Sequence, residues 1–369
     1  MKILRVSHWL YPDEIGGGEY HVHAMSRDQA AMGHDVTVLK VTDDVETVKR
    51  EWRDGYEIVY CPATFNVLKN DISIPVAKKI FGSSDFDVIH AHSHFYFSTN
   101  LAALNRCFSD TPLAITNHSL YSQSAPERVF DLYLRTIGKW TYNQADIAFC
   151  YTDAEKDALR ELGVKSRIEV IPNGIDTERF TPDGQGMESI DANGPVVLFV
   201  GRFVDGKRPE LVIDAFGDVL TEYPDAELYL CGDGPLHEST KHQTRDLGIN
   251  ESVTFIGEVS YEKMPTVYRS SDILVLPSRA EGVPRAVLEA MASGVPVVTS
   301  DLEQISKIVG KGGRVIQTDS ADALSATISK VLAADKASVS AREQVVENHQ
   351  WQSTVTHTTK LLESLCHCK

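Results

Sequence analysis

Short apolar runs alternate along the chain with longer segments in which apolar residues recur every three or four positions. The short runs are typical of strands buried on both faces of a sheet. In the first half they are Ile3–Ser7, Asp35–Lys40, Glu57–Tyr60, Val88–His90, Leu113–Thr116, Ile147–Cys150 and Ile168–Ile171. The helical segments are Glu19–Met32, Phe95–Arg106, Arg128–Asn143 and Ala154–Leu162. This alternation predicts parallel strands joined by crossover helices.

The second half of the chain repeats the pattern. Its predicted strands are Val196–Val200, Glu227–Cys231, Val253–Phe255, Ile273–Leu276 and Val295–Thr299. Its predicted helices are Pro209–Glu222, Leu236–Leu247, Glu262–Arg269 and Val287–Ala292. A stretch rich in Gly, Pro and Asp, from Thr181 to Pro195, is typical of a linker. We therefore predict an α/β protein of two Rossmann-like domains with a cleft between them.

The length of the chain agrees with this organisation, and its charge narrows the range of possible functions. The 369 residues exceed what one hydrophobic core usually supports. The formal net charge is −16 and no basic run offers a surface for nucleic acid, so any anion site must be local. No apolar stretch approaches the roughly 18 residues that span a bilayer, and Met1–Val6 is typical of a first strand rather than a signal peptide. We expect a cytoplasmic protein.

The most informative stretch runs from Ser278 to Val298. Its carboxylates Glu281 and Glu289 lie at the two ends of a turn followed by a helix, directly after the strand Ile273–Leu276. Open α/β sheets bind ligands at the carboxyl ends of their strands, where a helix N-terminus also offers N–H groups to an anion. Carboxylates there can accept hydrogen bonds from the hydroxyls of a sugar or a ribose.

Glu281, seven intervening residues, Glu289 and the following Ala-Met-Ala-x-Gly-x-Pro-Val-Val resemble the E-x7-E signature of retaining GT-B glycosyltransferases, family 4 in particular. The resemblance extends from the Gly16 loop to the tail after Trp351. It implies the GT-B fold, in which two Rossmann-like domains with parallel sheets face each other across a cleft. An acceptor-side domain of residues 1–177 would take back residues 350–369 as a crossover helix, and residues 178–349 would bind the donor.

The resemblance assigns roles to single side chains. Arg202 and Lys207 match the family's clamp on the donor diphosphate, and a guanidinium and an ammonium both suit phosphate oxygens. Glu281 would fix sugar hydroxyls and favour a cationic sugar ring, Glu289 would hold the ribose, and His118 would lie near the donor sugar. A solvated basic turn and a structural histidine are the competing interpretations.

Further donor contacts would come from the loops at the carboxyl ends of the strands. The predicted residues are Gly16, Gly17, Gly201, Gly232, Gly257, Glu258, Gly282, Val283, Val287 and Leu288. The Gly16 loop lacks the G-x-G-x-x-G spacing of a dinucleotide fingerprint, and no acidic residue ends the next predicted strand, which disfavours a dehydrogenase. Pro172-Asn173-Gly174 is a turn signal similar to the family's interdomain Pro-Asn-Gly, and we expect a hinge there. Pro284 stands where many members have glycine, so the identity of the transferred sugar stays open.

Two patterns invite a metal hypothesis. His90, His92 and His94 alternate, and would share one face if their strand continued. No fourth ligand is evident, and similar strings occur in the family without metal. Asp85-Phe86-Asp87 mimics a metal-binding D-x-D but lies at a strand start. We predict no metal and no cofactor requirement.

The predicted activity is retaining transfer of a sugar from a UDP- or GDP-sugar to a hydroxyl of a lipid-linked, glycan or small-molecule acceptor. Two alternatives stay open. One is a GT-B-like nucleotide-sugar epimerase or hydrolase; the other is a catalytically idle nucleotide-sugar binding protein.

Peripheral contact with the inner face of a membrane is a further expectation. It rests on Trp9, Leu10 and Tyr11, and on the segment Asn66–Phe81 with its three lysines, Lys69, Lys78 and Lys79. An ordinary amphipathic helix explains that segment equally well.

Overall fold

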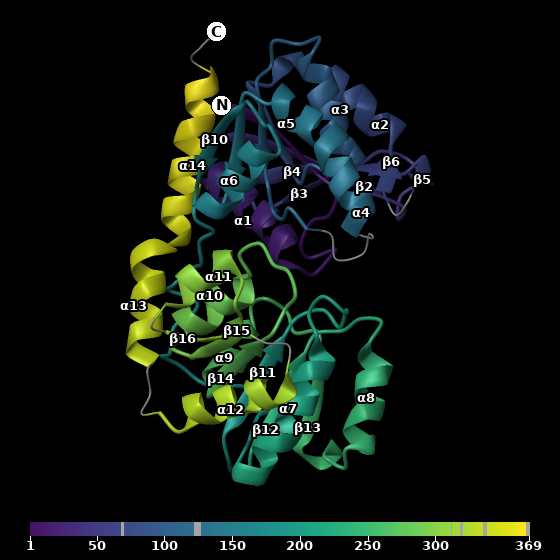
Figure 1. Ribbon diagram of the computed structural model, residues 1–369. Helices are drawn as coiled ribbons and strands as arrows, with labels where there is room; N and C mark the ends of the chain where they lie inside the picture. Colours follow the sequence, from purple (N-terminus) through teal and green to yellow (C-terminus); the bar gives the residue numbers. More distant parts are fainter. Residues whose placement is uncertain (68–69, 122–126, 311, 318–319, 335–337, 367–369) are drawn as a thin grey trace. The chain divides into compact units, whose positions relative to one another are not determined.

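The computed structural model describes residues 1–67, 70–121, 127–310, 312–317, 320–334 and 338–366. The chain forms two compact units, Met1–Pro172 with Ser353–Lys369 (unit 1) and Asn173–Gln352 (unit 2), shown in Figure 1. The predicted linker lies inside unit 2, where the Met187 N–H donates to Ser270 Oγ at 2.8 Å. That linker prediction is wrong because a segment without helix or strand can still be held in place by hydrogen bonds to its neighbours.

Unit 1 contains an eight-stranded sheet in the order β10-β9-β8-β7-β1-β2-β4-β3. Only the edge strand β3 is antiparallel to its neighbour. The strands are β1 (Lys2–Ser7), β2 (Asp35–Thr42), β3 (Lys49–Arg53), β4 (Tyr56–Pro62), β7 (Val88–His92), β8 (Leu113–Thr116), β9 (Ile147–Cys150) and β10 (Arg167–Val170), with β5 (Phe65–Val67) and β6 (Asn70–Ile72) in a separate pair. The sequence missed β3 because a charged edge strand has no apolar run.

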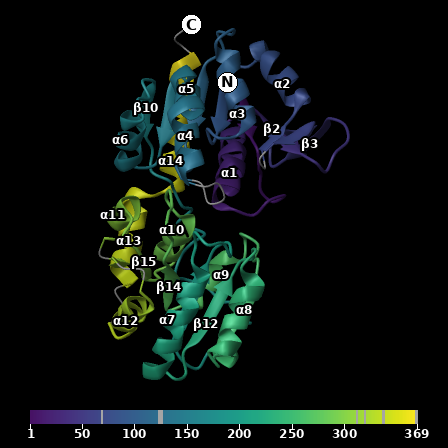
Figure 2. The ribbon, with the colours of Figure 1, turned by 45° about the vertical axis from the view of Figure 1, so that its right-hand side comes forward.

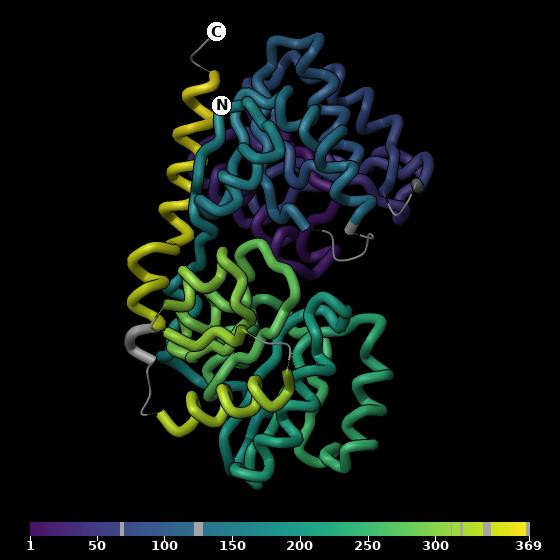
Figure 3. The backbone as a smooth tube through the Cα atoms, viewed as in Figure 1, coloured from purple at the N-terminus to yellow at the C-terminus, as the bar shows by residue number. Residues whose placement is uncertain are grey.

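Helices cover both faces of this sheet. They are α1 (Gly17–Ala31), α2 (Ile74–Phe81), α3 (Phe97–Arg106), α4 (Glu127–Tyr133), α5 (Lys139–Gln144), α6 (Asp153–Glu161) and α14 (Trp351–Cys366), with the short helices η1 (Ser83–Asp85) and η2 (Leu134–Gly138). Neighbouring strand residues point to opposite faces. Leu4 accordingly packs in one apolar cluster with Val76 of α2, and Ile3 packs in another with Leu362 of α14. Because most of α14 belongs to unit 1, the first strand and the last helix of the described chain lie in the same unit (Figure 3).

Unit 2 contains a six-stranded, fully parallel sheet in the order β13-β12-β11-β14-β15-β16. The strands are β11 (Val196–Val200), β12 (Glu227–Cys231), β13 (Val253–Gly257), β14 (Ile273–Leu276), β15 (Val297–Ser300) and β16 (Gly313–Ile316). The helices are α7 (Pro209–Glu222), α8 (His237–Asp246), α9 (Met264–Arg269), α10 (Arg285–Ala292), α11 (Glu303–Val309), α12 (Ala321–Leu332) and α13 (Ser338–Asn348), with the short η3 (Asn250–Ser252). Helix α12 packs against α7, and α13 packs against α10 (Figure 2).

The order of the parallel strands in each sheet reverses once, which marks where a ligand is expected. Open α/β sheets bind ligands outside the carboxyl ends of their strands at this reversal. It lies between β11 and β14 in unit 2, and between β1 and β7 in unit 1. The prediction of two Rossmann-like units with parallel sheets is confirmed.

Candidate functional site

The loop after β11, which carries Arg202, is held against the loop after β12. The Gly201 N–H donates to the Cys231 carbonyl at 3.0 Å, and the Phe203 N–H donates to the Asp233 carbonyl at 2.8 Å. Gly232 has φ of +129°, and a Cβ there would lie 3.0 Å from the carbonyl carbon of Gly201 and closer still to its oxygen. Only glycine therefore allows this close approach, and the backbone fixes where the Arg202 loop lies.

The same loop is joined to the loop after β14. Lys207 Nζ donates to Glu281 Oε1, and the two side chains are only 13% and 7% exposed. The Arg279 N–H donates to the Gly206 carbonyl at 2.9 Å, and Gln304 of α11 donates its side-chain amide to the Glu281 carbonyl. The structure thus brings Lys207 and Glu281 together at the reversal of the sheet, while Arg202 is exposed nearby.

Glu289 lies in the middle of α10 and is buried. Its Oε2 accepts a hydrogen bond from Tyr268 at 2.9 Å, and its Oε1 lies 3.5 Å from Arg285 Nε. Burial raises the pKa of the Glu289 carboxyl above its ordinary value, and the charge of Arg285 opposes that rise. Sequence reasoning missed Tyr268 and Arg285, because only the packing of α9 beside α10 brings the tyrosine to this carboxylate.

The remaining predicted donor residues divide into two groups. The Gly257 carbonyl accepts from the Gly232 N–H at 2.8 Å, so it belongs to the same set of loops, and Glu258 beside it is exposed. The Val287 and Leu288 side chains are buried, and both N–H groups donate to the Pro284 carbonyl, at 3.2 and 3.4 Å. The structure places both side chains in the packed side of α10, so any contact of these two residues with a donor would use their backbone.

Gly282 and Val283 link the Glu281 loop to the first turn of α10. Val283 is buried, and its carbonyl accepts from the Asn173 side-chain amide at 3.5 Å. Any contact of Val283 with a ligand would therefore use its backbone rather than its side chain.

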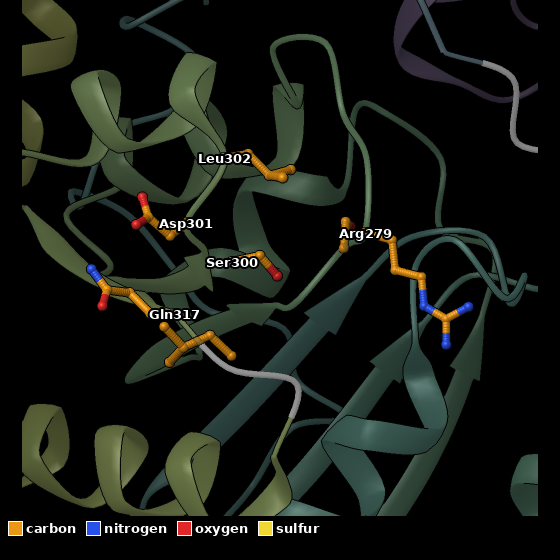
Figure 4. A pocket seen from close by; sticks show the side chains of 7 residues that line it. Arg279, Ser300, Asp301, Leu302 and Gln317 are labelled. Carbon is orange, nitrogen blue, oxygen red and sulfur yellow. The ribbon is translucent and has the colours of Figure 1, made fainter. Parts of the chain in front are cut away.

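A pocket of about 360 Å³ opens at the carboxyl ends of β14, β15 and β16 (Figure 4). Its lining is mostly polar and consists of Ser278, Arg279, Ser300, Asp301, Leu302, Ile316 and Gln317. Through Ser278 and Arg279 it adjoins the Glu281 loop, although none of the predicted donor residues lines it.

Family models match both halves of the chain. Residues 15–179 match Glycosyltransferase Family 4, and residues 186–350 match Glycosyl transferases group 1. The chain belongs to the family 4, group 1 glycosyltransferases. It is 26% identical over 378 residues to the GDP-mannose-dependent alpha-(1-6)-phosphatidylinositol monomannoside mannosyltransferase of Mycolicibacterium smegmatis, covering 95% of this chain and 96% of that protein.

Solved structures show that this glycosyltransferase has the GT-B fold. Sucrose-phosphate synthase from Thermosynechococcus elongatus superposes with a TM-score of 0.81 at 20% identity, covering 100% of both chains. Anabaena Alr3699/HepE in complex with UDP and glucose also gives a TM-score of 0.81, at 19% identity, covering 99% of this chain and 100% of that one. The predicted family, fold and enzyme class are confirmed.

In unit 1 of the glycosyltransferase, His118 is held from both sides. Its Nε2 lies 3.0 Å from His92 Nδ1, and its Nδ1 lies 2.9 Å from the Tyr151 hydroxyl. Gly18, in the first turn of α1, lies against the same ring, and a Cβ there would be 3.6 Å from Nδ1. Both ring nitrogens are thus used within unit 1, so a sugar hydroxyl would have to share one of them.

The three alternating histidines do not share one face, because β7 ends at His92 and Ser93 turns the chain with φ of +63°. His90 Nε2 lies 2.8 Å from Thr116 Oγ1, and His94 Nδ1 lies 2.9 Å from the Tyr142 hydroxyl. Burial lowers the pKa of His94 to about 3 and that of His90 and His92 well below the ordinary value. These contacts account for three neutral imidazoles with different partners.

Neither metal hypothesis finds a converging set of ligands. Across the described ranges, no three His, Cys, Asp or Glu residues are grouped so that they could hold a metal ion. In the predicted D-x-D, Asp87 accepts a hydrogen bond from the Lys2 N–H at 2.7 Å, which is a structural contact beside β1.

The Gly16 loop of the glycosyltransferase has an acidic side chain beside the predicted phosphate contacts. Gly16 precedes α1, and the Glu19 carboxylate folds back so closely that a Cβ on Gly16 would collide with it. This negative charge opposes phosphate binding at Gly16 and Gly17. In the argument against a dehydrogenase, the missing acidic residue is wrong, because β2 continues to Thr42 and is followed by Asp43 and Asp44.

The predicted membrane patch is only partly at the surface. Trp9 is 37% exposed, and Ile74 and Phe81 of α2 are also exposed, whereas Leu10 and Tyr11 are buried and do not contribute. Lys69 lies outside the described residues. In the part of the chain that the structure describes, no helix combines the length and the apolarity needed to cross a bilayer.

Proposed function

We propose that this glycosyltransferase moves a sugar, with retention of anomeric configuration, from a nucleotide-diphosphate sugar to an acceptor hydroxyl. The observation that carries the proposal is the Lys207–Glu281 pair at the reversal of the unit 2 sheet, with Glu289 on the helix that follows. This combination offers a cation to a diphosphate, a carboxylate to a sugar, and a second carboxylate to a ribose.

The central electrostatic problem is charge separation. As the bond between the anomeric carbon and the diphosphate oxygen breaks, negative charge grows on the diphosphate and positive charge grows on the sugar ring. Lys207 and Arg202 would stabilise the leaving group, and Glu281 would stabilise the ring. Because Lys207 and Glu281 are mostly buried and already hydrogen-bonded, they are preorganised for this task.

Retention follows if the acceptor oxygen attacks from the side on which the diphosphate leaves. The acceptor hydroxyl forms the new bond to the anomeric carbon, and its proton passes to an oxygen of the departing phosphate. This front-face substitution needs no side-chain nucleophile. It also agrees with the contacts of His118, whose ring nitrogens are occupied by His92 and Tyr151, so that its role would be to border the reacting centre.

For the acceptor we propose a cyclic polyol such as inositol, carried by a lipid. The reversal of the unit 1 sheet has an aromatic group beside it, in which His8 stacks on Tyr96 at 4.4 Å and the partly exposed Trp9 meets Tyr96 edge-on at 5.7 Å. A sugar or cyclitol ring can stack on such a surface. The mycobacterial relative supports this choice, since its name gives GDP-mannose as donor and a phosphatidylinositol mannoside as acceptor.

The function is tested by incubating the protein with each of a panel of UDP- and GDP-sugars. Each donor is offered with phosphatidylinositol vesicles or with free inositol as acceptor. One donor should give a glycosylated product with the anomeric configuration of the donor, observed by NMR. Inversion would refute the retaining mechanism. Rapid release of free nucleotide without any acceptor would instead favour the epimerase or hydrolase alternative.

A further inference from the structure

The chain passes between the two units twice, at Pro172/Asn173 and at Gln352/Ser353. Inside unit 2 the two crossing segments, 173–175 and 349–351, are bound to each other. The Ile175 N–H donates to the His349 carbonyl at 2.7 Å, and the Trp351 N–H donates to the Ile175 carbonyl at 3.0 Å. A parallel bridge joins Ile175 to Gln350. The two segments therefore form one paired element.

Arg285, the first residue of α10, holds this paired element. Its Nη1 donates to the Gly174 carbonyl at 3.3 Å, and its guanidinium carbon lies 5.8 Å from the ring centre of Trp351. Its Nη2 donates to the Tyr261 hydroxyl at 2.8 Å. The side chain is buried, so each of these contacts is protected from solvent. One guanidinium thus contacts both crossing segments.

The same guanidinium faces the carboxylate that we propose to hold the ribose. Arg285 Nε lies 3.5 Å from Glu289 Oε1, one helical turn further along α10. A ribose diol that donates to Glu289 would change the hydrogen bonds and the charge that this carboxylate shares with Arg285. Arg285 would then change the strength of its contacts with Gly174 and Trp351.

We propose that Arg285 is a positioning residue that couples the nucleotide-holding carboxylate, Glu289, to the paired crossing segments. The inference rests on the proposed function, because it needs a nucleotide at Glu289. Coupling is reciprocal: a nucleotide that changes the crossing segments must bind with an affinity that depends on them. The arrangement gives donor binding a direct route to the two segments through which the chain passes between the units.

Arg285→Lys separates charge from geometry. Lysine keeps a cation near Glu289 but has no planar fork to reach Gly174 and Tyr261 together. We expect the affinity for UDP or GDP to change by no more than about threefold, because lysine keeps a positive charge beside Glu289. We expect kcat to fall about 10- to 100-fold, the range for misplacing a reacting group by up to about 1 Å.

Arg342→Lys is the matched control. Arg342 also ties unit 2 segments together, donating to the Phe180 carbonyl at 2.9 Å, the Thr177 carbonyl at 3.1 Å and the Ala292 carbonyl. These three hydrogen bonds end on backbone carbonyls rather than on Glu289. This variant should lose thermal stability without the selective loss of kcat. Tyr261→Phe, which removes a hydroxyl that is hydrogen-bonded to Arg285 and also to Glu289, serves as a second variant if Arg285→Lys does not fold.

The direct test follows the fluorescence of Trp351 in a protein whose other tryptophans, Trp9, Trp52 and Trp140, are replaced by Phe. UDP and GDP are titrated while calorimetry measures binding. In the protein that keeps Arg285, and in Arg342→Lys, nucleotide should change the emission of Trp351. In Arg285→Lys and in Tyr261→Phe, the change at equal saturation should be less than half as large. An undiminished change in those variants, or no change in the parent despite binding, overturns the coupling. If neither nucleotide binds the parent, the proposed function fails and the inference fails with it.

Discussion

The substitution Gly232→Ala tests whether backbone packing positions the Arg202 loop. A Cβ at this position would lie 3.0 Å from the carbonyl carbon of Gly201 and closer to its oxygen, and 3.7 Å from the Gly201 nitrogen. All three atoms belong to the backbone, so no flexible side chain can move aside. The φ of +129° adds strain, because L-residues rarely adopt it.

The expected magnitude follows from these distances. Restoring an ordinary contact requires the Gly201 loop to shift by roughly 1 Å, and a misplacement of that size costs about 10²-fold in turnover. Strain at a special backbone conformation costs about 1–3 kcal/mol, which corresponds to a fall in melting temperature of roughly 2–12 °C for a unit of this size.

Gly248→Ala is the matched control for the assay. Gly248 also has positive φ, +69°, but a Cβ there would meet no atom within 4 Å. It should therefore lose stability from backbone strain while kcat stays within about twofold of the parent, because nothing in the site moves. The reasoning is refuted if both alanine variants show the same kcat, or if Gly232→Ala melts lower without losing turnover.

Four further predictions concern the site and the histidines. Lys207→Ala should reduce turnover by roughly 10²–10³-fold with the fold intact, as expected for losing one preorganised charge, and Arg202→Ala should act in the same direction. Glu289→Gln should mainly weaken binding of nucleoside diphosphate, whereas Glu281→Gln should mainly lower kcat, because a charge beside the sugar ring matters most in the transition state. Activity should persist in EDTA, since the proposed positive charge comes from side chains. Melting temperature should fall from pH 6.5 toward pH 4, because the pKa of His94, about 3 when folded, lies below its ordinary value of 6.5, so the unfolded chain takes up the proton.

Each of these predictions has a clear contrary result. Near-normal turnover in both Lys207→Ala and Arg202→Ala would refute the proposed diphosphate clamp. Loss of nucleotide affinity in Glu281→Gln alone would show that the two carboxylates have the opposite roles. Activity that is lost in EDTA and restored by a divalent ion would show that the reaction requires a metal ion. For the pH series, His94→Gln is the control, and it should flatten the dependence of melting temperature on pH. Burial raises the pKa of Glu155 to about 7, so this carboxyl acts in the opposite direction over part of the range.

The sequence predicts those parts of the fold that apolar runs define. It does not predict those that depend on long-range packing. Strands β11 and β14 were predicted with the bounds that the structure shows, because both are short runs of buried residues between turn signals. Strand β16 was missed, since Gly313 and Arg314 break its apolar pattern.

The candidate site shows the same division. Lys207 and Glu281 were singled out because each follows a predicted strand and matches a motif of the family. The structure joins them because β11 and β14 are neighbours in the sheet. Arg285 was not singled out, because its importance lies in contacts with Gly174 and Trp351, which are far from it in sequence. No spacing rule within one helix could have indicated those contacts.

The central claim is that the reversal of the unit 2 sheet holds a nucleoside diphosphate through Lys207 and Glu289. The most direct test compares the binding of UDP with UMP, and of GDP with GMP, by calorimetry. For the preferred base, the parent protein should bind the diphosphate at least about tenfold more tightly than the monophosphate, equivalent to about 1.4 kcal/mol, and Lys207→Ala should abolish that difference. Absence of nucleotide binding, or an unchanged preference for the diphosphate in Lys207→Ala, would contradict the claim.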